Sequence, residues 1–283
     1  MKALRPSLIL ALCLGVAACS DDDSDANGNV NPGPETTDDA GNDSDDSGDG
    51  PTDEPGDSDG GDDTDGDTDP ETCTETNTAI GTCEDERAEV IEPIDAVTEG
   101  EVKVLSTDGS ILSLYVDASA GGTAQAASNP YVYIKLSTGE RVDITDVEAP
   151  SSLEWDLAIK RTVFATNSGH WGPGVGGALF LDGKDFDEVT IADAAGITIP
   201  GESLFVDSCE PNVDGRGSPY TTFGDWYEYD PQTHATPPKD GTFLIRAADC
   251  SLFKLRIESN TATPEGGTDG PVNARYLLSV APL

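Results

Sequence analysis

The stretch WDLAIKRTVFATNSGHWGPGVGGA, residues 155–178, carries the most specific pattern in the sequence. In its first half, Trp155 to Thr166, most apolar side chains fall on alternate positions, which is the periodicity of a β-strand. Its second half, Asn167 to Gly177, has five glycines and one proline in eleven residues, so the backbone must turn tightly or approach another surface closely. The stretch therefore predicts a long strand that runs into a glycine loop.

His170 and Trp171 lie at the head of this loop and are candidates for a binding site. The chain has only two histidines and three tryptophans. Imidazole is the commonest metal ligand in proteins, and an indole ring can pack on a flat ligand. The alternative for this pair is an exposed loop histidine beside a tryptophan that packs in the core.

Two ordered blocks of the sequence resemble the HmuY-like lipoproteins. The first block has WDLA at 155–158, KR at 160–161, TNSG at 166–169 and GGA at 176–178. The second has WYEYDPQTH at 226–234, Pro238, FLIRAAD at 243–249 and FKLRI at 253–257. The resemblance covers roughly Tyr131 to Leu283, and two blocks in the same order are much harder to obtain by chance than one. It implies an all-β fold on a lipid anchor, and haem binding at the bacterial surface.

The N-terminus is typical of a lipoprotein signal peptide, residues 1–18. Lys2 and Arg5 precede an apolar run, Leu8 to Ala18, that is about half the length of roughly 20 residues that a membrane span needs. Cys19 follows two small residues, which predicts that its thiol carries a lipid that anchors the protein in a membrane. Together with the resemblance, this anchor implies an outer-membrane lipoprotein of the cell envelope, exposed at the cell surface.

Residues 19–86 predict a disordered acidic linker. Residues 20–86 contain 25 Asp and Glu and no Lys or Arg. So few apolar side chains cannot bury enough surface to offset the entropy lost on ordering, and repulsion between like charges extends the segment.

The mature chain keeps four cysteines that can form disulfides: Cys73, Cys83, Cys209 and Cys250. An even number in an exported protein predicts two bridges, for which three connectivities exist. Nearness in sequence favours Cys73–Cys83, and Cys209–Cys250 then lies wholly within the folded domain. No pair has the C-x-x-C spacing of zinc sites.

The remaining residues, 87–283, predict a single antiparallel β-rich domain. Short runs of strand-like residues recur between turn signals, with no long amphipathic helix and no internal repeat. The predicted strands are Glu101–Leu105, Ser110–Val116, Tyr131–Leu136, Glu140–Ile144, Trp155–Thr166, Leu179–Leu181, Trp226–Tyr229, Gly241–Arg246, Leu252–Glu258 and Tyr276–Val280. The turn Ser137-Thr138-Gly139 is expected to join the strands Tyr131–Leu136 and Glu140–Ile144 in a hairpin.

Charge and composition exclude several functions. Residues 87–283 carry 30 Asp and Glu against 13 Lys and Arg, whereas nucleic-acid binding requires clustered basic charge. Two histidines and no G-x-S-x-G motif leave little for a hydrolase. Asp225, Glu228 and Asp230 could form a glycosidase pair, but such clusters arise freely in an acidic domain. We expect no enzyme and no nucleic-acid partner.

Haem is the cofactor that the resemblance implies, and its iron needs an axial ligand from His, Met, Cys or Tyr. We expect His170 and His234 as the iron ligands, with Trp171 and Tyr227 or Tyr229 packing on the porphyrin. The expected partners are haem or a haem-carrying protein, and an outer-membrane receptor. A surface module for another ligand or partner, and a structural or adhesive envelope protein, remain alternatives.

Overall fold

The computed structural model describes residues 83, 90–224 and 226–283. The predicted signal peptide, the predicted lipidation site Cys19, Cys73 and almost all of the predicted linker lie outside the described residues. Within the described part of the chain, no helix is both long enough and apolar enough to cross a membrane.

The described chain is all-β with antiparallel strands, as predicted, and its strands form two sheets. The six-stranded sheet has the order β1-β2-β10-β9-β8-β7, and the four-stranded sheet has the order β4-β3-β5-β6. The strands are β1 (Val102–Asp108), β2 (Ile111–Asp117), β3 (Val132–Lys135), β4 (Glu140–Val142), β5 (Leu157–Lys160), β6 (Val163–Thr166), β7 (Gly177–Asp182), β8 (Gly241–Arg246), β9 (Leu252–Ser259) and β10 (Arg275–Pro282). Short 3-10 helices lie between them: η3 (Ala126–Ser128), η4 (Ala149–Ser151), η5 (Phe186–Glu188) and η6 (Ile191–Asp193).

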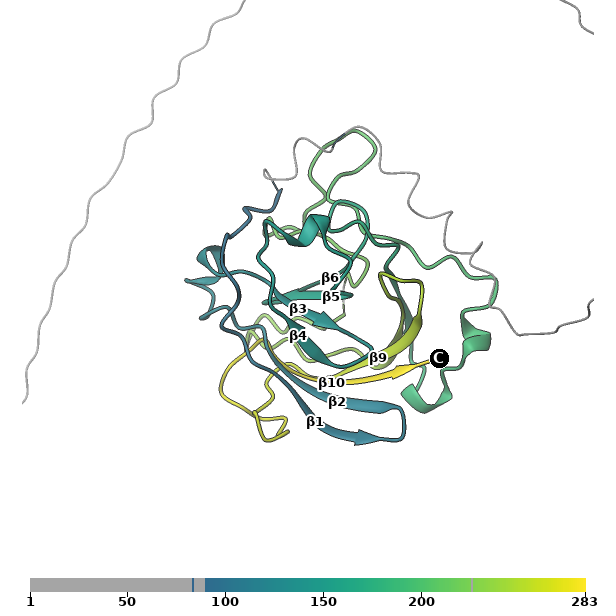
Figure 1. The fold of residues 1–283 in the computed structure, drawn as a ribbon. Coiled ribbons are helices and arrows are strands. Elements are labelled where there is room, and N and C mark those ends of the chain that lie inside the picture. The colour runs from purple at the N-terminus through teal and green to yellow at the C-terminus, as the bar shows by residue number, and fades with distance from the viewer. Residues whose placement is uncertain (1–82, 84–89, 225) are drawn as a thin grey trace, which may run out of the picture. The chain divides into compact units, whose positions relative to one another are not determined.

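The main core lies between the two sheets (Figure 1). Alternate residues of β9 and β10 point inward and are buried, while their neighbours along each strand are partly exposed, which is the pattern of a sheet with one covered face. Leu157, Ile159 and Phe164 of the small sheet belong to the same core cluster as Leu255 and Leu278 of the large one. Burial of these side chains is the main force that holds the sheets together.

The predicted long strand from Trp155 to Thr166 is wrong, because the chain reverses in its middle. β5 and β6 form a hairpin in which Lys160 pairs with Val163. Arg161 adopts a positive φ of 55°, its N–H donates to the carbonyl of Ala118, and its carbonyl accepts from the Tyr276 hydroxyl. These contacts with distant residues stabilise a turn that an arginine rarely makes by itself.

The predicted hairpin of Tyr131–Leu136 and Glu140–Ile144 is confirmed as β3 and β4. The predicted strand at Trp226–Tyr229 is not: only an isolated bridge joins Tyr227 to Pro238. The next pair, Tyr229 with Thr236, would need an N–H from Pro237, and proline has none.

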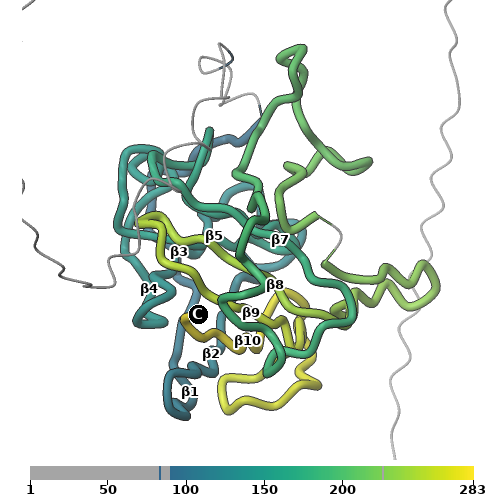
Figure 2. The backbone as a smooth tube through the Cα atoms, turned by 90° about the vertical axis from the view of Figure 1, so that its right-hand side faces the viewer, coloured from purple at the N-terminus to yellow at the C-terminus, as the bar shows by residue number. Residues whose placement is uncertain are grey.

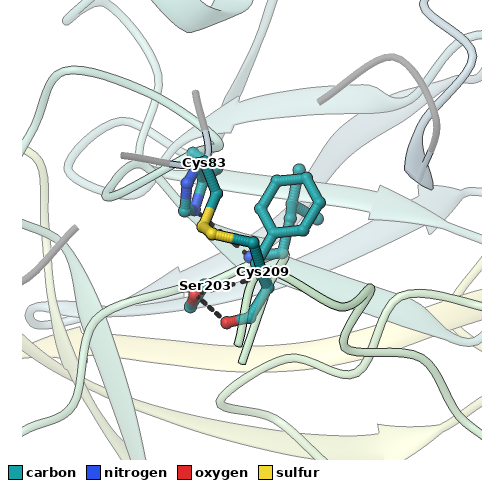
Figure 3. Close-up of a disulfide and its surroundings, with 6 residues drawn as sticks. Cys83, Ser203 and Cys209 are labelled. Carbon is teal, nitrogen blue, oxygen red and sulfur yellow. Dashed lines mark hydrogen bonds between the residues drawn. A yellow bond between two sulfur atoms is a disulfide. The ribbon is translucent and has the colours of Figure 1, made fainter. Parts of the chain in front are cut away.

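The favoured disulfide pairs are also wrong. Cys83 is bonded to Cys209 across 126 residues of sequence, beside Ser203 (Figure 3). Both half-cystines pack in a second core cluster, so the pairing is decided by where the loop before Cys209 folds and not by nearness in sequence. Cys250 is disulfide-bonded as well, to a residue outside the described ones. Cys83 lies within the predicted linker, yet its side chain is buried in the folded domain.

Candidate functional site

The WDLA segment forms part of the scaffold. The Asp156 carboxylate is fully buried and accepts hydrogen bonds from the backbone N–H of Leu136 at 2.9 Å and of Ala248 at 3.1 Å, and from Lys135 Nζ at 3.0 Å. The Trp155 indole N–H donates to the carbonyl of Ala149 at 3.0 Å. All these polar groups are directed at other parts of the fold, so the segment does not present them to a ligand.

The glycine loop closes around a buried asparagine. Asn167 Nδ2 donates to the carbonyls of Ser152 and Trp155, both at 2.8 Å, and its Oδ1 accepts from the N–H of Gly174 at 2.9 Å. A Cβ atom at Gly172 would collide with the Asn167 side chain. The loop is rich in glycine because its backbone packs directly on Asn167.

His170 and Trp171 are buried in the second core cluster. Their side chains are 8% and 2% exposed. His170 Nδ1 accepts from the N–H of Leu204 at 3.4 Å, and its ring centre lies 5.0 Å from that of Phe205. Trp171 packs edge-on against Tyr131, with 5.2 Å between ring centres. Neither ring presents a face to a ligand that approaches from solvent.

The other three residues that we predicted to contact a ligand lie together on the surface, beside an arginine. Arg216, Tyr227, Tyr229 and His234 form what we call the Tyr229 cluster. The Tyr229 hydroxyl is 2.6 Å from His234 Nδ1, and the guanidinium carbon of Arg216 lies 4.6 Å from the centre of the Tyr229 ring. Arg216 Nη1 donates to the Tyr227 hydroxyl at 3.4 Å. Tyr229 is 44% exposed, and Arg216 and His234 are exposed too, so the cluster is open to solvent.

A tight turn holds His234 in place. Asp230 accepts hydrogen bonds from the N–H of Gln232 at 2.8 Å and from the Thr233 hydroxyl at 2.6 Å. The bond from Thr233 is the main cause that lowers the pKa of Asp230, followed by the bond from Gln232. His234 closes the turn with a positive φ of 59° and donates its N–H to the carbonyl of Asp230 at 2.8 Å.

A second turn presents Arg216. Asp214 Oδ1 accepts from the backbone N–H of Arg216 at 2.8 Å and of Ser218 at 2.9 Å. An isolated bridge between Val213 and Pro219 closes the small loop. Figure 2 shows the loops of this green part of the chain extending beyond the labelled strands. The cluster therefore belongs to two neighbouring surface loops, each held by an aspartate.

A buried carboxylate fixes the start of these loops to β6. Glu202 is 2% exposed, and its Oε1 accepts from the Thr166 N–H at 3.0 Å. Its Oε2 accepts from the Thr222 N–H at 2.9 Å, and the hydroxyls of both threonines also donate to Oε1. Burial raises the pKa of Glu202, although these four bonds act in the opposite direction.

A larger cavity elsewhere on the domain lacks the groups that haem requires. That cavity has a volume of about 660 Å³, but Asp185, Asp187, Glu188 and Glu258 surround its single arginine, Arg256. Its lining contains no His, Met, Cys or Tyr to ligate iron, and its carboxylates repel the propionates of haem. The cavity beside Tyr227 holds only about 50 Å³, so a ligand of the cluster would lie on an open surface.

No group of three or more His, Cys, Asp or Glu in the described part of the chain is arranged to hold a bare metal ion. Glu228 and Asp230 flank Tyr229, while Asp225 lies outside the described residues. Trp226 is 1% exposed and packs on Phe164 and Tyr276, so it offers no platform for a sugar.

Sequence reasoning missed Arg216. Its only local signal is its position between two glycines, Gly215 and Gly217, in a domain poor in basic residues. Its contacts with Tyr227 and Tyr229 depend on how two loops lie side by side.

Comparison with known proteins places these features in a family. The sequence model of the HmuY protein family matches residues 127–276. No curated protein matches the chain. A protein of Bacteroides fragilis assigned as a lipoprotein has 18% identity and a TM-score of 0.39, over 63% of this chain and 93% of its own.

Two further solved structures are similar to the chain. A protein of Bacteroides vulgatus assigned as HmuY-like and haem-binding has 16% identity and a TM-score of 0.40, over 64% of this chain and 97% of its own. The apo form of the HmuY analogue of Tannerella forsythia has 16% identity and a TM-score of 0.36, over 67% of this chain and 100% of its own.

Proposed function

Because the chain belongs to the HmuY family, we propose that it is a haem-binding lipoprotein of the bacterial cell envelope and that the Tyr229 cluster is its haem site. In this proposal the protein is a binding protein and not an enzyme. Its partners are haem, or a protein that carries haem, and an outer-membrane receptor.

The hydrogen bond between Tyr229 and His234 is the observation that carries the proposal. A histidine that binds a metal usually donates its other ring N–H to a fixed acceptor, which sets the tautomer and the ring orientation. If His234 Nδ1–H donates to the Tyr229 oxygen, the lone pair of Nε2 would be left to hold the haem iron. Haem iron accepts such a nitrogen ligand when it is bound.

The aromatic rings of the cluster supply the second part of the site. Tyr227 is half-buried against the main core, and Tyr229 exposes a large part of its ring beside it. Such rings give a flat apolar ligand contact area at little cost in side-chain entropy. His170 and Trp171 contact Leu204, Phe205 and Tyr131 instead, so a haem held by both histidines would require the glycine loop to open.

Haem titration of three variants tests the site. We expect His234→Ala to abolish the Soret shift and Tyr229→Phe to weaken haem binding roughly 10- to 100-fold, because the orienting acceptor is lost. Tyr220→Phe is the matched control: this exposed tyrosine lines the small cavity beside Tyr227 but is not one of the four cluster residues, and loss of its hydroxyl should leave the affinity unchanged. Full affinity in both His234→Ala and Tyr229→Phe would contradict the proposed site.

A non-haem surface module is the second candidate function, and the open surface around the Tyr229 cluster favours it. A small ligand usually binds in a cavity of roughly 300–1,000 Å³, whereas the cavity beside Tyr227 is far smaller. Exposed Tyr220 and Tyr229 would suit a protein partner, since tyrosine is enriched in such interfaces. A complete absence of a Soret shift in the wild-type protein would favour this candidate.

The membrane anchor is tested separately. We expect the wild-type chain to fractionate with membranes and Cys19→Ala to be released into the soluble fraction, because the acyl chains on Cys19 supply the membrane affinity. Ser20→Ala, at the neighbouring position, retains Cys19 and serves as the control for a substitution in this segment. A Cys19→Ala protein that still fractionated with membranes would exclude the anchor.

A further inference from the structure

We infer that Arg216 is a carboxylate-binding residue that recognises the propionates of haem and so selects ligands that carry free carboxylates. The inference rests on the proposed function, since it assigns a partner to the one cation of the Tyr229 cluster. It concerns a different part of the ligand from the iron.

Arg216 differs from the other arginines that the structure describes. The other five are each held by a carboxylate or by backbone carbonyls: Arg141 by Asp143 and the carbonyl of Gly100, Arg161 by the carbonyls of Ser119 and Asn273, Arg246 by those of Val175 and Ile199, Arg256 by Asp185 and Asp240, and Arg275 by Asp117. Arg216 has neither kind of acceptor among the described residues, and its side chain donates only to the Tyr227 hydroxyl.

This difference matters because the domain is strongly acidic. With 30 Asp and Glu against 13 Lys and Arg in residues 87–283, an exposed arginine readily finds a carboxylate partner. Asp214 is the acidic residue nearest in sequence, but its Oδ1 accepts from the backbone N–H groups of Arg216 and Ser218. The guanidinium therefore keeps most of its five N–H donors for an external acceptor.

Two tyrosines orient the guanidinium. It lies over the ring of Tyr229 and donates to the hydroxyl of Tyr227. Stacking on an aromatic face stabilises the cation and leaves the N–H groups at its edge accessible, and this edge matches a carboxylate in a bidentate pair. The arginine is thus held before any ligand arrives.

The position of Arg216 also suits a single ligand that reaches both Arg216 and His234, which contact different parts of Tyr229. The guanidinium contacts the face of this ring, while His234 contacts its hydroxyl. In haem the carboxylates extend from the edge of the porphyrin, away from the iron. A haem with its iron at His234 can therefore direct a propionate to Arg216.

Titration of the full chain with haem and with haem dimethyl ester tests the inference. The ester keeps the iron and the porphyrin but has no free carboxylates. We expect the wild-type protein to bind the ester about tenfold more weakly than haem, the size of a lost charge-assisted hydrogen bond. We expect Arg216→Gln to weaken haem binding by a similar factor and to leave the affinity for the ester unchanged. The affinity of Arg216→Lys for haem should lie between those of the wild type and Arg216→Gln.

Controls separate the possible outcomes. Lys103→Gln removes an exposed positive charge whose Nζ donates to the carbonyl of Pro264, and should bind both ligands as the wild type does. Tryptophan fluorescence quenching provides a second readout of affinity. Haem binding that is equal in wild type and Arg216→Gln, or an equal loss for haem and ester, would overturn the inference while the proposed function stands. No binding of haem by the wild type would overturn both.

Discussion

Glu202→Ala is expected to lower the free energy of unfolding of the domain by about 3 kcal/mol. The substitution leaves the buried N–H of Thr166 and the partly buried N–H of Thr222 without their acceptor, and removes the acceptor of both threonine hydroxyls. Each buried donor without a partner costs roughly 1–3 kcal/mol, and the cavity left by the side chain adds to the loss. Urea unfolding of the full chain, followed by tryptophan fluorescence, measures the change.

Glu202→Gln is the matched control and reveals the pH dependence. Burial raises the pKa of Glu202 in the folded state above its unfolded value. The stabilisation from its protonated form is then fully present below about pH 4.3 and is lost as the pH rises through the folded value. Because glutamine does not titrate, the stability of wild type relative to Glu202→Gln should fall as the pH rises from about 4.3 through the folded pKa of Glu202. An alanine variant as stable as the wild type would refute this role of Glu202.

Loss of the Cys83–Cys209 disulfide is expected to destabilise the domain by a similar amount, about 2–4 kcal/mol. The bond closes a loop of 126 residues, and cross-links over long loops restrict the unfolded chain most. Cys209→Ser, compared with wild type under non-reducing conditions, measures the effect. The double variant Cys83→Ser/Cys209→Ser should be no less stable than Cys209→Ser alone, because the same disulfide is lost in both.

Peptide mapping without reduction tests the connectivity itself. We expect a peptide that joins Cys83 to Cys209, and a second that joins Cys250 to Cys73, the remaining cysteine of the mature chain after lipidation. A peptide that joins Cys209 to Cys250 would contradict the structure.

Much of the fold could be predicted from the sequence, because alternation of apolar and polar residues is a local signal. The run from Phe253 to Glu258 alternates strictly and lies in β9, and the turn Ser137-Thr138-Gly139 joins β3 to β4. The hairpin of β5 and β6 could not be predicted in the same way. Its turn at Arg161 is stabilised by Ala118 and Tyr276, which are distant in sequence.

The site was only partly predictable for the same reason. Tyr227, Tyr229 and His234 lie close together in sequence, so a shared site was a reasonable expectation. Arg216 joins them from another loop, and His170 leaves them because it packs against Phe205. Contacts between residues that are close in sequence could therefore be predicted. Contacts between separate loops, and the disulfide between Cys83 and Cys209, depend on the complete fold.

The most direct test of the account compares the two histidines as haem ligands. Haem is titrated into full-length wild type, His170→Asn and His234→Ala, and the Soret band is recorded. Asparagine at position 170 keeps an acceptor for the N–H of Leu204 and so limits disturbance of the buried loop. The account predicts that His170→Asn binds haem as the wild type does and that His234→Ala does not. An unfolding curve shows whether His170→Asn is folded. Loss of haem binding in folded His170→Asn, together with retained binding in His234→Ala, would contradict the account.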